Sequence, residues 1–253
     1  MKNSLPREVL PERQKGAILE TKTSGGLSQD SGGSFSPAVP EDRLRFKRLS
    51  ELDYWKRKKT GEGVLNHAHY PEFFTRHFGF EKSFWAGKKI LDVGCGPRGS
   101  LEWAEDAACR VGCDPLAAEY LEVGITAHRM RYVAGEAERM PFPDGTFDGV
   151  FSFNSLDHVD HLPETCREII RVIAPGGFFL LLTDVNHEPT VCEPAEYSWD
   201  IVSSFLPVLT LLEERHYERA ESGLYQSIWA NVPFDHGKRV ERRGVLSAKF
   251  QKK

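Results

Sequence analysis

The segment Ile90-Leu-Asp-Val-Gly-Cys-Gly-Pro-Arg-Gly99 decides the fold of this chain. An apolar run of the kind that forms a buried strand leads into three glycines, and a helix is expected to follow. Glycines let the backbone approach a ligand closely, and a helix N-terminus offers free N–H groups. The three glycines fit the GxGxxG spacing of dinucleotide sites. Asp114 follows about twenty residues later, where an acid would hold ribose hydroxyls.

Asp92 narrows the choice of ligand. A dinucleotide would place its pyrophosphate at this turn, where a carboxylate two residues before the first glycine would repel it. A ligand with a cationic amino-acid group would be attracted instead. The pattern therefore favours an adenosine ligand that carries positive charge over NAD or FAD, and it leaves a purely structural glycine turn as the alternative.

Strands and helices alternate on both sides of this turn. Strands are expected at 89–93, 110–113, 131–134, 147–153 and 177–183, with β-rich stretches at 208–217 and 224–232. Helices are expected at 100–106, 116–123, 164–173 and 195–205. Such alternation is typical of an α/β protein with a doubly wound, mostly parallel sheet.

Composition divides the chain into four parts. Residues 1–40 are rich in Gly, Ser, Pro and charge, so a disordered arm is expected there. Residues 41–87 carry an apolar residue at every third position from Phe46 to Trp55, which predicts an amphipathic helix in an N-terminal helical lid. Residues 88–237 form the ligand-binding domain. Residues 238–253 are a basic tail, expected to be solvated.

Composition also excludes several classes of protein. No apolar run approaches the roughly 20 residues of a membrane span, and residues 1–16 lack the apolar core of a secretory signal. The five cysteines form no CxxC pair, which indicates reduced thiols and a cytoplasmic location. Residues 90–237 carry 9 Lys and Arg against 25 Asp and Glu. This acidic surface predicts neither a nucleic-acid nor a membrane partner, and the oligomeric state is left open.

Four segments in this order resemble the class I S-adenosylmethionine-dependent methyltransferases of the small-molecule, methyltransferase domain 11-like type. They are ILDVGCGPRG (90–99), VGCDP (111–115), GEAERMPFPDGTFDGVFSFNSLDHV (135–159) and REIIRVIAPGGFFLLL (167–182). The resemblance covers a little over a third of the chain. It implies S-adenosyl-L-methionine as cofactor and a Rossmann-like, seven-stranded class I methyltransferase fold. Arg98 departs from the family's loop, because the third glycine comes one residue later.

The resemblance also implies a cofactor site. Asp92 and the glycine turn would line the methionine part, Asp114 would bind the ribose hydroxyls, and Glu136 would read the adenine edge. The full expected set is Asp92, Gly94, Cys95, Gly96, Asp114, Pro115, Glu136, Ala137, Asn154, Ser155 and Leu156.

His158 and Asp157 follow the fourth expected strand and are the catalytic candidates. An imidazole titrates near neutral pH, so His158 is expected to be the general base, with Asp157 orienting it or replacing it. Capping of the next helix is the structural alternative. Tyr70, Arg98 and His187 are expected to contact the substrate. No metal site is expected, because adjacent loop residues seldom point at one centre.

The predicted function is transfer of a methyl group to a small molecule, with the hydroxyl of a metabolite, sugar or natural product as the favoured acceptor. Methylation of nitrogen or carbon would use the same fold. A protein or RNA methyltransferase, a nucleotide-dependent oxidoreductase and a non-catalytic protein with this fold are the alternatives.

Overall fold

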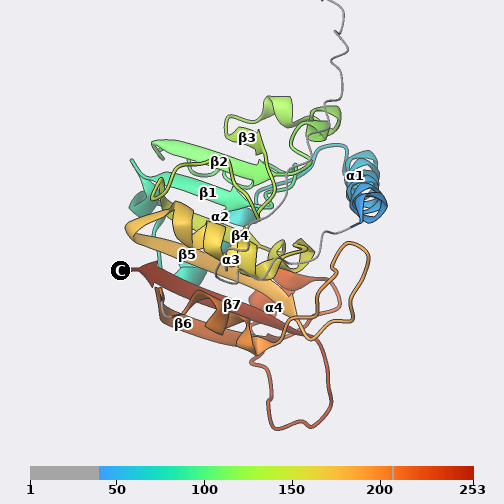
Figure 1. The fold of residues 1–253 in the computed structure, drawn as a ribbon, viewed down its shortest axis with the longest axis vertical. Helices are drawn as coiled ribbons and strands as arrows, with labels where there is room; N and C mark the ends of the chain where they lie inside the picture. The colour runs from blue at the N-terminus through green and yellow to red at the C-terminus, as the bar shows by residue number, and fades with distance from the viewer. Residues whose placement is uncertain (1–39, 207) are drawn as a thin grey trace, which may run out of the picture. The chain divides into compact units, whose positions relative to one another are not determined.

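The chain folds around one seven-stranded sheet. A computed structural model describes residues 40–206 and 208–253, so the expected arm lies outside the described residues except for its last position. The strands are β1 (Lys89–Val93), β2 (Cys109–Asp114), β3 (Arg131–Ala134), β4 (Phe147–Phe153), β5 (Ile173–Val185), β6 (Leu209–Glu218) and β7 (Gly244–Lys252). Their order in the sheet is β3-β2-β1-β4-β5-β7-β6 (Figure 1). The first five strands are parallel and β7 is antiparallel to both neighbours, which confirms the predicted doubly wound, mostly parallel α/β fold.

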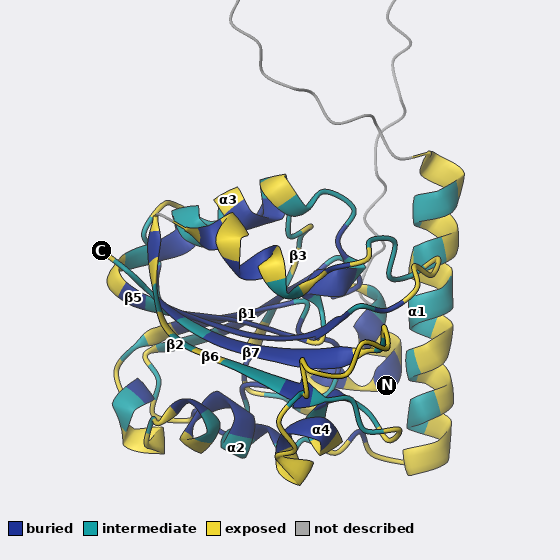
Figure 2. Cartoon of the chain, turned by 90° about the horizontal axis from the view of Figure 1, so that it is seen from below, coloured by how far each residue is buried: buried dark blue, intermediate teal, exposed yellow. Residues whose placement is uncertain are grey.

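Helices cover both faces of the sheet (Figure 2). One face packs against α3 (Leu162–Val172) and the 3₁₀ helix η6 (Trp199–Phe205). The other face packs against α2 (Tyr70–Phe74), η1 (Arg76–Phe78), η2 (Lys82–Trp85) and α4 (Leu224–Ala230). Three further 3₁₀ helices, η3 (Glu119–Val123), η4 (Ile125–Ala127) and η5 (Leu156–His158), follow β2 and β4. Among the described helices, none is both long and apolar enough to cross a membrane.

The central strands supply a core to both faces. In β5, Phe179 and Leu181 belong to the cluster under α3, and Leu180 and Leu182 belong to the cluster under α2. This follows from the two-residue period of a strand, in which successive side chains point to opposite faces. All four side chains are fully buried. The continuous apolar run therefore marks a strand that is covered on both sides.

Part of the expected lid is core instead. Phe73, Phe74 and Trp85 are buried against the sheet. The Trp85 ring lies so close to Gly149 of β4 that a Cβ there would meet the ring at 2.4 Å. Residues 70–85 are therefore fixed by apolar packing, whereas α1 (Glu41–Glu62) has no fully buried residue.

The expected basic tail is wrong, because residues 244–252 form β7 between β5 and β6. The apolar residues of this segment are fully buried, and its lysines turn to carbonyl groups at the edge of the core. Lys249 Nζ donates to the Phe78 carbonyl at 2.8 Å, and Lys252 Nζ donates to the Ile170 carbonyl at 2.7 Å. The positive charges of this segment predict a solvated end, because charge indicates exposure on average.

Two local expectations also differ from the structure. Residues 224–230 form α4 and not a strand, because Leu224 and Ile228 are four residues apart and bury one helical face. Residues 100–106 form turns and not a helix. The other expected strands and the helix at α3 are confirmed within a few residues.

His77 makes the stability of this fold sensitive to acid. Its Nε2 atom lies 2.7 Å from Ser247 Oγ of β7. Burial, together with the nearby Arg215, lowers the pKa of His77 to about 4, although Glu213 opposes the shift. The unfolded chain therefore binds a proton here below about pH 6.5, whereas the folded chain does not until about pH 4.

We expect stability to fall as the pH is lowered from about 6.5 to 4, with His77 contributing up to about 3 kcal/mol of the loss. Urea unfolding at pH 7, 5.5 and 4.5 measures it. His77→Gln should flatten this pH dependence, and an equal slope in the variant and the parent chain would contradict the assignment.

Candidate functional site

The loops after β1 and β4 meet at the carboxyl end of the sheet. Gly94 adopts φ 71°, and a Cβ at this position would lie 2.4 Å from the Cβ of Ser155. Ser155 Oγ donates to the Val93 carbonyl at 2.7 Å and so joins the two loops. The glycine is required here for two reasons, its left-handed backbone and the close approach of the neighbouring loop.

Two buried carboxylates lie beside the glycine loop. Asp114 ends β2, and its two oxygens accept hydrogen bonds from the backbone N–H groups of Gly96 at 3.0 Å and Leu116 at 2.9 Å. Asp92 accepts a hydrogen bond from Ser100 Oγ. Burial raises the pKa of Asp92 to about 7 and that of Asp114 to about 6. A cationic ligand would favour the ionised form of both groups.

A pocket opens in front of these carboxylates. Its walls from the sheet side include six of the expected cofactor residues, Gly94, Pro115, Glu136, Ala137, Ser155 and Leu156. Ligands of open α/β sheets bind at this edge, beyond the carboxyl ends of the strands. The residues present fit an adenosine ligand with a cationic end, because glycine backbone, apolar walls and carboxylates converge on one space.

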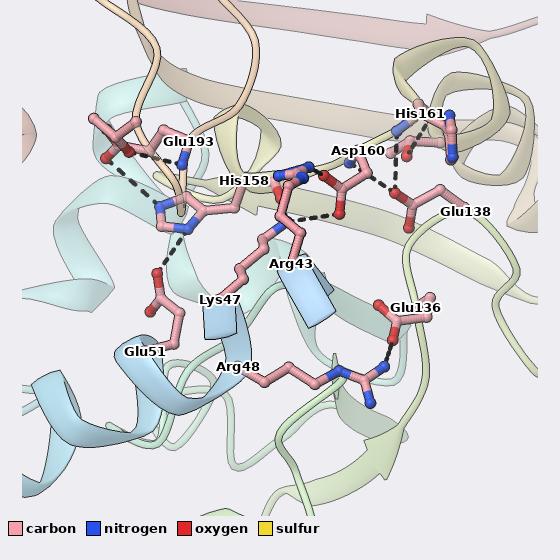
Figure 3. Close-up of polar contacts among 12 residues, drawn as sticks. Arg43, Lys47, Arg48, Glu51, Glu136, Glu138, His158, Asp160, His161 and Glu193 are labelled. Atoms are coloured by element: carbon pink, nitrogen blue, oxygen red, sulfur yellow. Dashed lines mark hydrogen bonds and ion pairs between the residues drawn. The ribbon is translucent and has the colours of Figure 1, made fainter. Parts of the chain in front are cut away.

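Helix α1 covers this pocket and is held there by charges. Its side chains Leu44, Lys47 and Arg48 line the pocket. Arg48 pairs with Glu136, as Figure 3 shows. Arg43 and Lys47 both pair with Asp160, in the loop after η5. The ion pairs connect α1 to two separate loops at the carboxyl edge of the sheet.

The second half of α1 contacts the glycine loop directly. A Cβ on Gly96 would lie 3.1 Å from the Trp55 ring. Glu62, the last residue of α1, accepts two hydrogen bonds of 2.7 Å from Arg98. The apolar stripe predicted for this helix is buried only in part, since Phe46 is 58% exposed. The predicted helix is confirmed, whereas its expected amphipathic packing is wrong over the first half.

His158 lies where α1, η5 and a later loop converge. Its Nδ1 atom is 2.9 Å from Glu51 Oε1 of α1, and its Nε2 atom is 3.9 Å from Glu193 Oε1 (Figure 3). Burial alone would lower the pKa of His158, but Glu51, Asp157 and Glu193 raise it to about 9. Three carboxylates therefore surround one imidazole at the rim of the pocket.

Comparison with known proteins identifies this arrangement. Residues 91–181 match the family described as "Methyltransferase domain". The chain carries a class I S-adenosylmethionine-dependent methyltransferase domain. The matched residues run from β1 through β5 and so include the glycine loop and both buried carboxylates.

The names of curated relatives of the methyltransferase domain describe methyltransferases of small molecules. One is a demethylmenaquinone methyltransferase of Symbiobacterium thermophilum, 34% identical over 159 residues, which are 58% of this chain and 62% of that protein. Another is a sterol 4-C-methyltransferase of Caenorhabditis elegans, 26% identical over 178 residues, 55% of this chain and 53% of that protein. The chain thus spans less than two thirds of the length of these relatives.

A solved structure supports the fold over most of the chain. It is a Burkholderia thailandensis 1,6-didemethyltoxoflavin-N1-methyltransferase with bound 1,6-didemethyltoxoflavin and S-adenosylhomocysteine. The TM-score is 0.56 at 15% sequence identity, covering 87% of this chain and 93% of that chain. At this identity the likeness concerns the fold alone.

The expected cofactor residues do not all line the pocket. Besides the six that do, Asp92 and Asp114 adjoin the lining residues Val93 and Pro115, and Gly96 donates to Asp114. The Cys95 side chain is buried toward Gly112, so only its backbone faces the loop. Asn154 is exposed with φ 55° just after β4.

Two of the three expected substrate residues are neighbours: burial raises the pKa of Tyr70, and the nearby Arg98 opposes this shift. Tyr70 is buried, with its ring centroid 5.7 Å from that of Tyr225. Arg98 forms an ion pair with Glu62 of α1. His187 is 2% exposed, and its Nδ1 lies 3.0 Å from the Glu188 carbonyl oxygen. His187 lies near His158, because both rings approach Glu193: His187 Nδ1 is 3.9 Å from Glu193 Oε2.

Sequence reasoning missed the charged residues of α1. Arg43, Lys47 and Glu51 follow one another at intervals of four and therefore share one helical face. That spacing is visible in the sequence, but it does not show which residues these side chains contact. Glu138 was also missed, and its Oε1 accepts hydrogen bonds from the backbone N–H groups of Asp160 and His161.

We expect Asp114→Ala to weaken binding of S-adenosylhomocysteine by roughly 10- to 150-fold. The ligand would lose a charge-assisted hydrogen bond of about 1.5–3 kcal/mol, and the N–H groups of Gly96 and Leu116 would lose their acceptor. Calorimetric titration measures the change, with Asp106→Ala at an exposed position as control. Unchanged affinity in Asp114→Ala would contradict its assignment to the ribose.

Proposed function

We propose that this protein transfers the methyl group of S-adenosylmethionine to a hydroxyl oxygen of a small-molecule acceptor. The observation that carries the proposal is the pocket itself. Six of the expected cofactor residues line it, and His158 lines it from the side of η5. The curated relatives act on sterols and quinones by name, which supports a small-molecule acceptor.

The chain's own residues would divide the work between cofactor and acceptor. S-adenosylmethionine supplies an electrophilic methyl carbon, whose bond to sulfur breaks with the electron pair staying on sulfur as the bond to the acceptor oxygen forms. Asp114 and Glu136 would hold the nucleoside, and Asp92 would favour the cationic amino-acid end. Holding both reactants in line supplies much of the rate acceleration.

His158 and Asp157 would act on the acceptor. Because His158 Nδ1 is bonded to Glu51, Nε2 is the ring atom left to take the hydroxyl proton. It does so in the neutral ring, which predominates only above the raised pKa of about 9. The Glu51 carboxylate then stabilises the charge that the ring gains, as an acid does beside a histidine base. Asp157 is buried next to it and orients the ring or receives the proton in its place. Tyr70, Arg98 and His187 remain proposed substrate contacts.

Carbon methylation is the second candidate, because the names of several curated relatives specify it. Two of them are the sterol 4-C-methyltransferase and a sterol 24-C-methyltransferase of Aspergillus fumigatus, 32% identical over 127 residues. A base at His158 would then remove a proton from carbon or from an adjacent hydroxyl.

The test is calorimetric titration with S-adenosylmethionine, S-adenosylhomocysteine and NAD, followed by an acceptor screen with methyl-labelled cofactor. We expect micromolar binding of the first two and none of NAD. Product fragmentation by mass spectrometry then distinguishes methylation of oxygen from methylation of carbon. Binding of NAD in place of S-adenosylmethionine would overturn the proposal.

A further inference from the structure

Three potential metal ligands converge at the rim of the pocket from two distant parts of the chain. Asp157 and His158 belong to η5, and Glu193 belongs to the loop between β5 and η6. One ligand atom from each lies within 4.8 Å of the other two. Donor atoms at this separation can all reach one ion placed between them, as coordination of a divalent cation requires.

The orientation of His158 suits a metal ligand. A coordinating histidine commonly donates its second ring N–H to a carboxylate, which fixes the ring and its tautomer. Here Nδ1 is bonded to Glu51 at 2.9 Å, while Nε2 faces Glu193. Glu51 comes from α1 and is not one of the three converging residues, so this contact is a separate observation.

A buried acid also lacks a partner at this point. Asp157 is 1% exposed, and its Oδ1 has no hydrogen-bond partner within residues 40–206 and 208–253. His187, 2% exposed and 3.9 Å from Glu193, has an Nε2 atom in the same condition within these ranges. Buried polar atoms without partners carry a free-energy cost that a bound cation would remove.

We propose that Asp157, His158 and Glu193 bind a divalent transition-metal ion, with Glu51 holding the His158 ring through Nδ1. The imidazole nitrogen favours an ion such as Zn²⁺ or Ni²⁺ over Mg²⁺, Ca²⁺ or Mn²⁺, which prefer oxygen donors. This departs from the expectation of no metal site. That expectation rests on adjacent residues of a single loop, whereas Glu193 belongs to a different loop.

The role of the ion rests on the proposed function, whereas its binding does not. The site adjoins the pocket through His158. An ion here would occupy the Nε2 lone pair, so that His158 would hold the ion and would not act as the base. The ion would bind the acceptor's hydroxyl oxygen and lower its pKa, so that the hydroxyl proton leaves to water before the oxygen attacks the methyl carbon. The substrate class is then a small molecule whose accepting oxygen can bind a metal, such as a phenol or an enol.

The test measures binding of Zn²⁺ and Ni²⁺ alone to the whole chain by titration calorimetry and equilibrium dialysis. A second histidine pair needs a control, because His216 Nδ1 lies 2.9 Å from Nε2 of the exposed His236. All proteins therefore carry His236→Gln. We expect one ion per chain, with affinity reduced at least about 100-fold by Glu193→Gln or His158→Gln. Glu51→Gln should reduce it by about 10- to 100-fold.

Glu196→Gln is the matched control, since this exposed glutamate lies three residues after Glu193. Its affinity should equal that of the parent, and circular dichroism should show each variant folded. No stoichiometric binding, or equal binding by parent and Glu193→Gln, would overturn the metal site. Titration of S-adenosylhomocysteine with EDTA present separates the two proposals, because its failure would count against the proposed function alone.

Discussion

Replacing His158 by alanine should lower the turnover of methyl transfer by about 10²- to 10⁴-fold, the usual contribution of a positioned acid or base. The imidazole is the group between the pocket and Glu51, and alanine leaves the acceptor without it. The loss should fall on kcat at saturating acceptor, and single-turnover transfer of labelled methyl measures it.

The same variant should bind S-adenosylhomocysteine as tightly as the parent chain. Asp114 and the glycine loop lie behind the pocket and do not depend on His158 for their hydrogen bonds. His161→Ala is the matched control, because His161 lies in the same loop at the start of α3. Full activity of His158→Ala would remove this residue from the reaction.

The largest effect on stability is expected from Phe250→Ala in β7. The Phe250 ring is fully buried. It stacks with the Phe179 ring at a centroid distance of 5.7 Å and packs against the tilted Phe205 ring at 5.3 Å. Removing a buried aromatic ring leaves a cavity and costs about 3–5 kcal/mol. Denaturant unfolding should show this loss, provided that the slope of the transition is unchanged.

Phe46→Ala supplies the control for this loss. The side chain is the same, but it lies on α1 and is 58% exposed, so its removal should change the free energy of unfolding by less than about 0.5 kcal/mol. A small effect of Phe250→Ala would mean that β7 contributes little to the core. That result would favour the sequence-based prediction that this segment is a solvated tail.

The sequence was sufficient where the signal is local. The run from Ile90 to Gly99 contains the strand, the turn and the buried acid within ten residues, and Asp114 comes at the end of the next strand. These features depend on backbone conformation and on neighbours in sequence. For that reason the parallel sheet and the rear wall of the pocket could be predicted.

The sequence was insufficient where partners are distant. Glu51 and His158 are 107 residues apart, and no local pattern pairs them. The prediction of a basic tail at residues 244–252 is wrong for a related reason. The apolar run is short and flanked by positive charge, and only pairing with β5 and β6 buries it. Charges indicate exposure on average, yet Lys249 and Lys252 reach past the core to carbonyl groups.

The attachment of α1 has a consequence for the energetics of access. No residue of α1 is fully buried, but its Leu52 and Trp55 pack against the buried cluster of Leu116, Tyr120, Val123 and Ile125. Detachment of α1 would therefore break ion pairs as well as these apolar contacts, and dissolved salt weakens the electrostatic part over a Debye length of about 8 Å at physiological ionic strength. Entry to the pocket should thus respond to ionic strength more strongly than unfolding does, because the two clusters that cover the sheet are apolar.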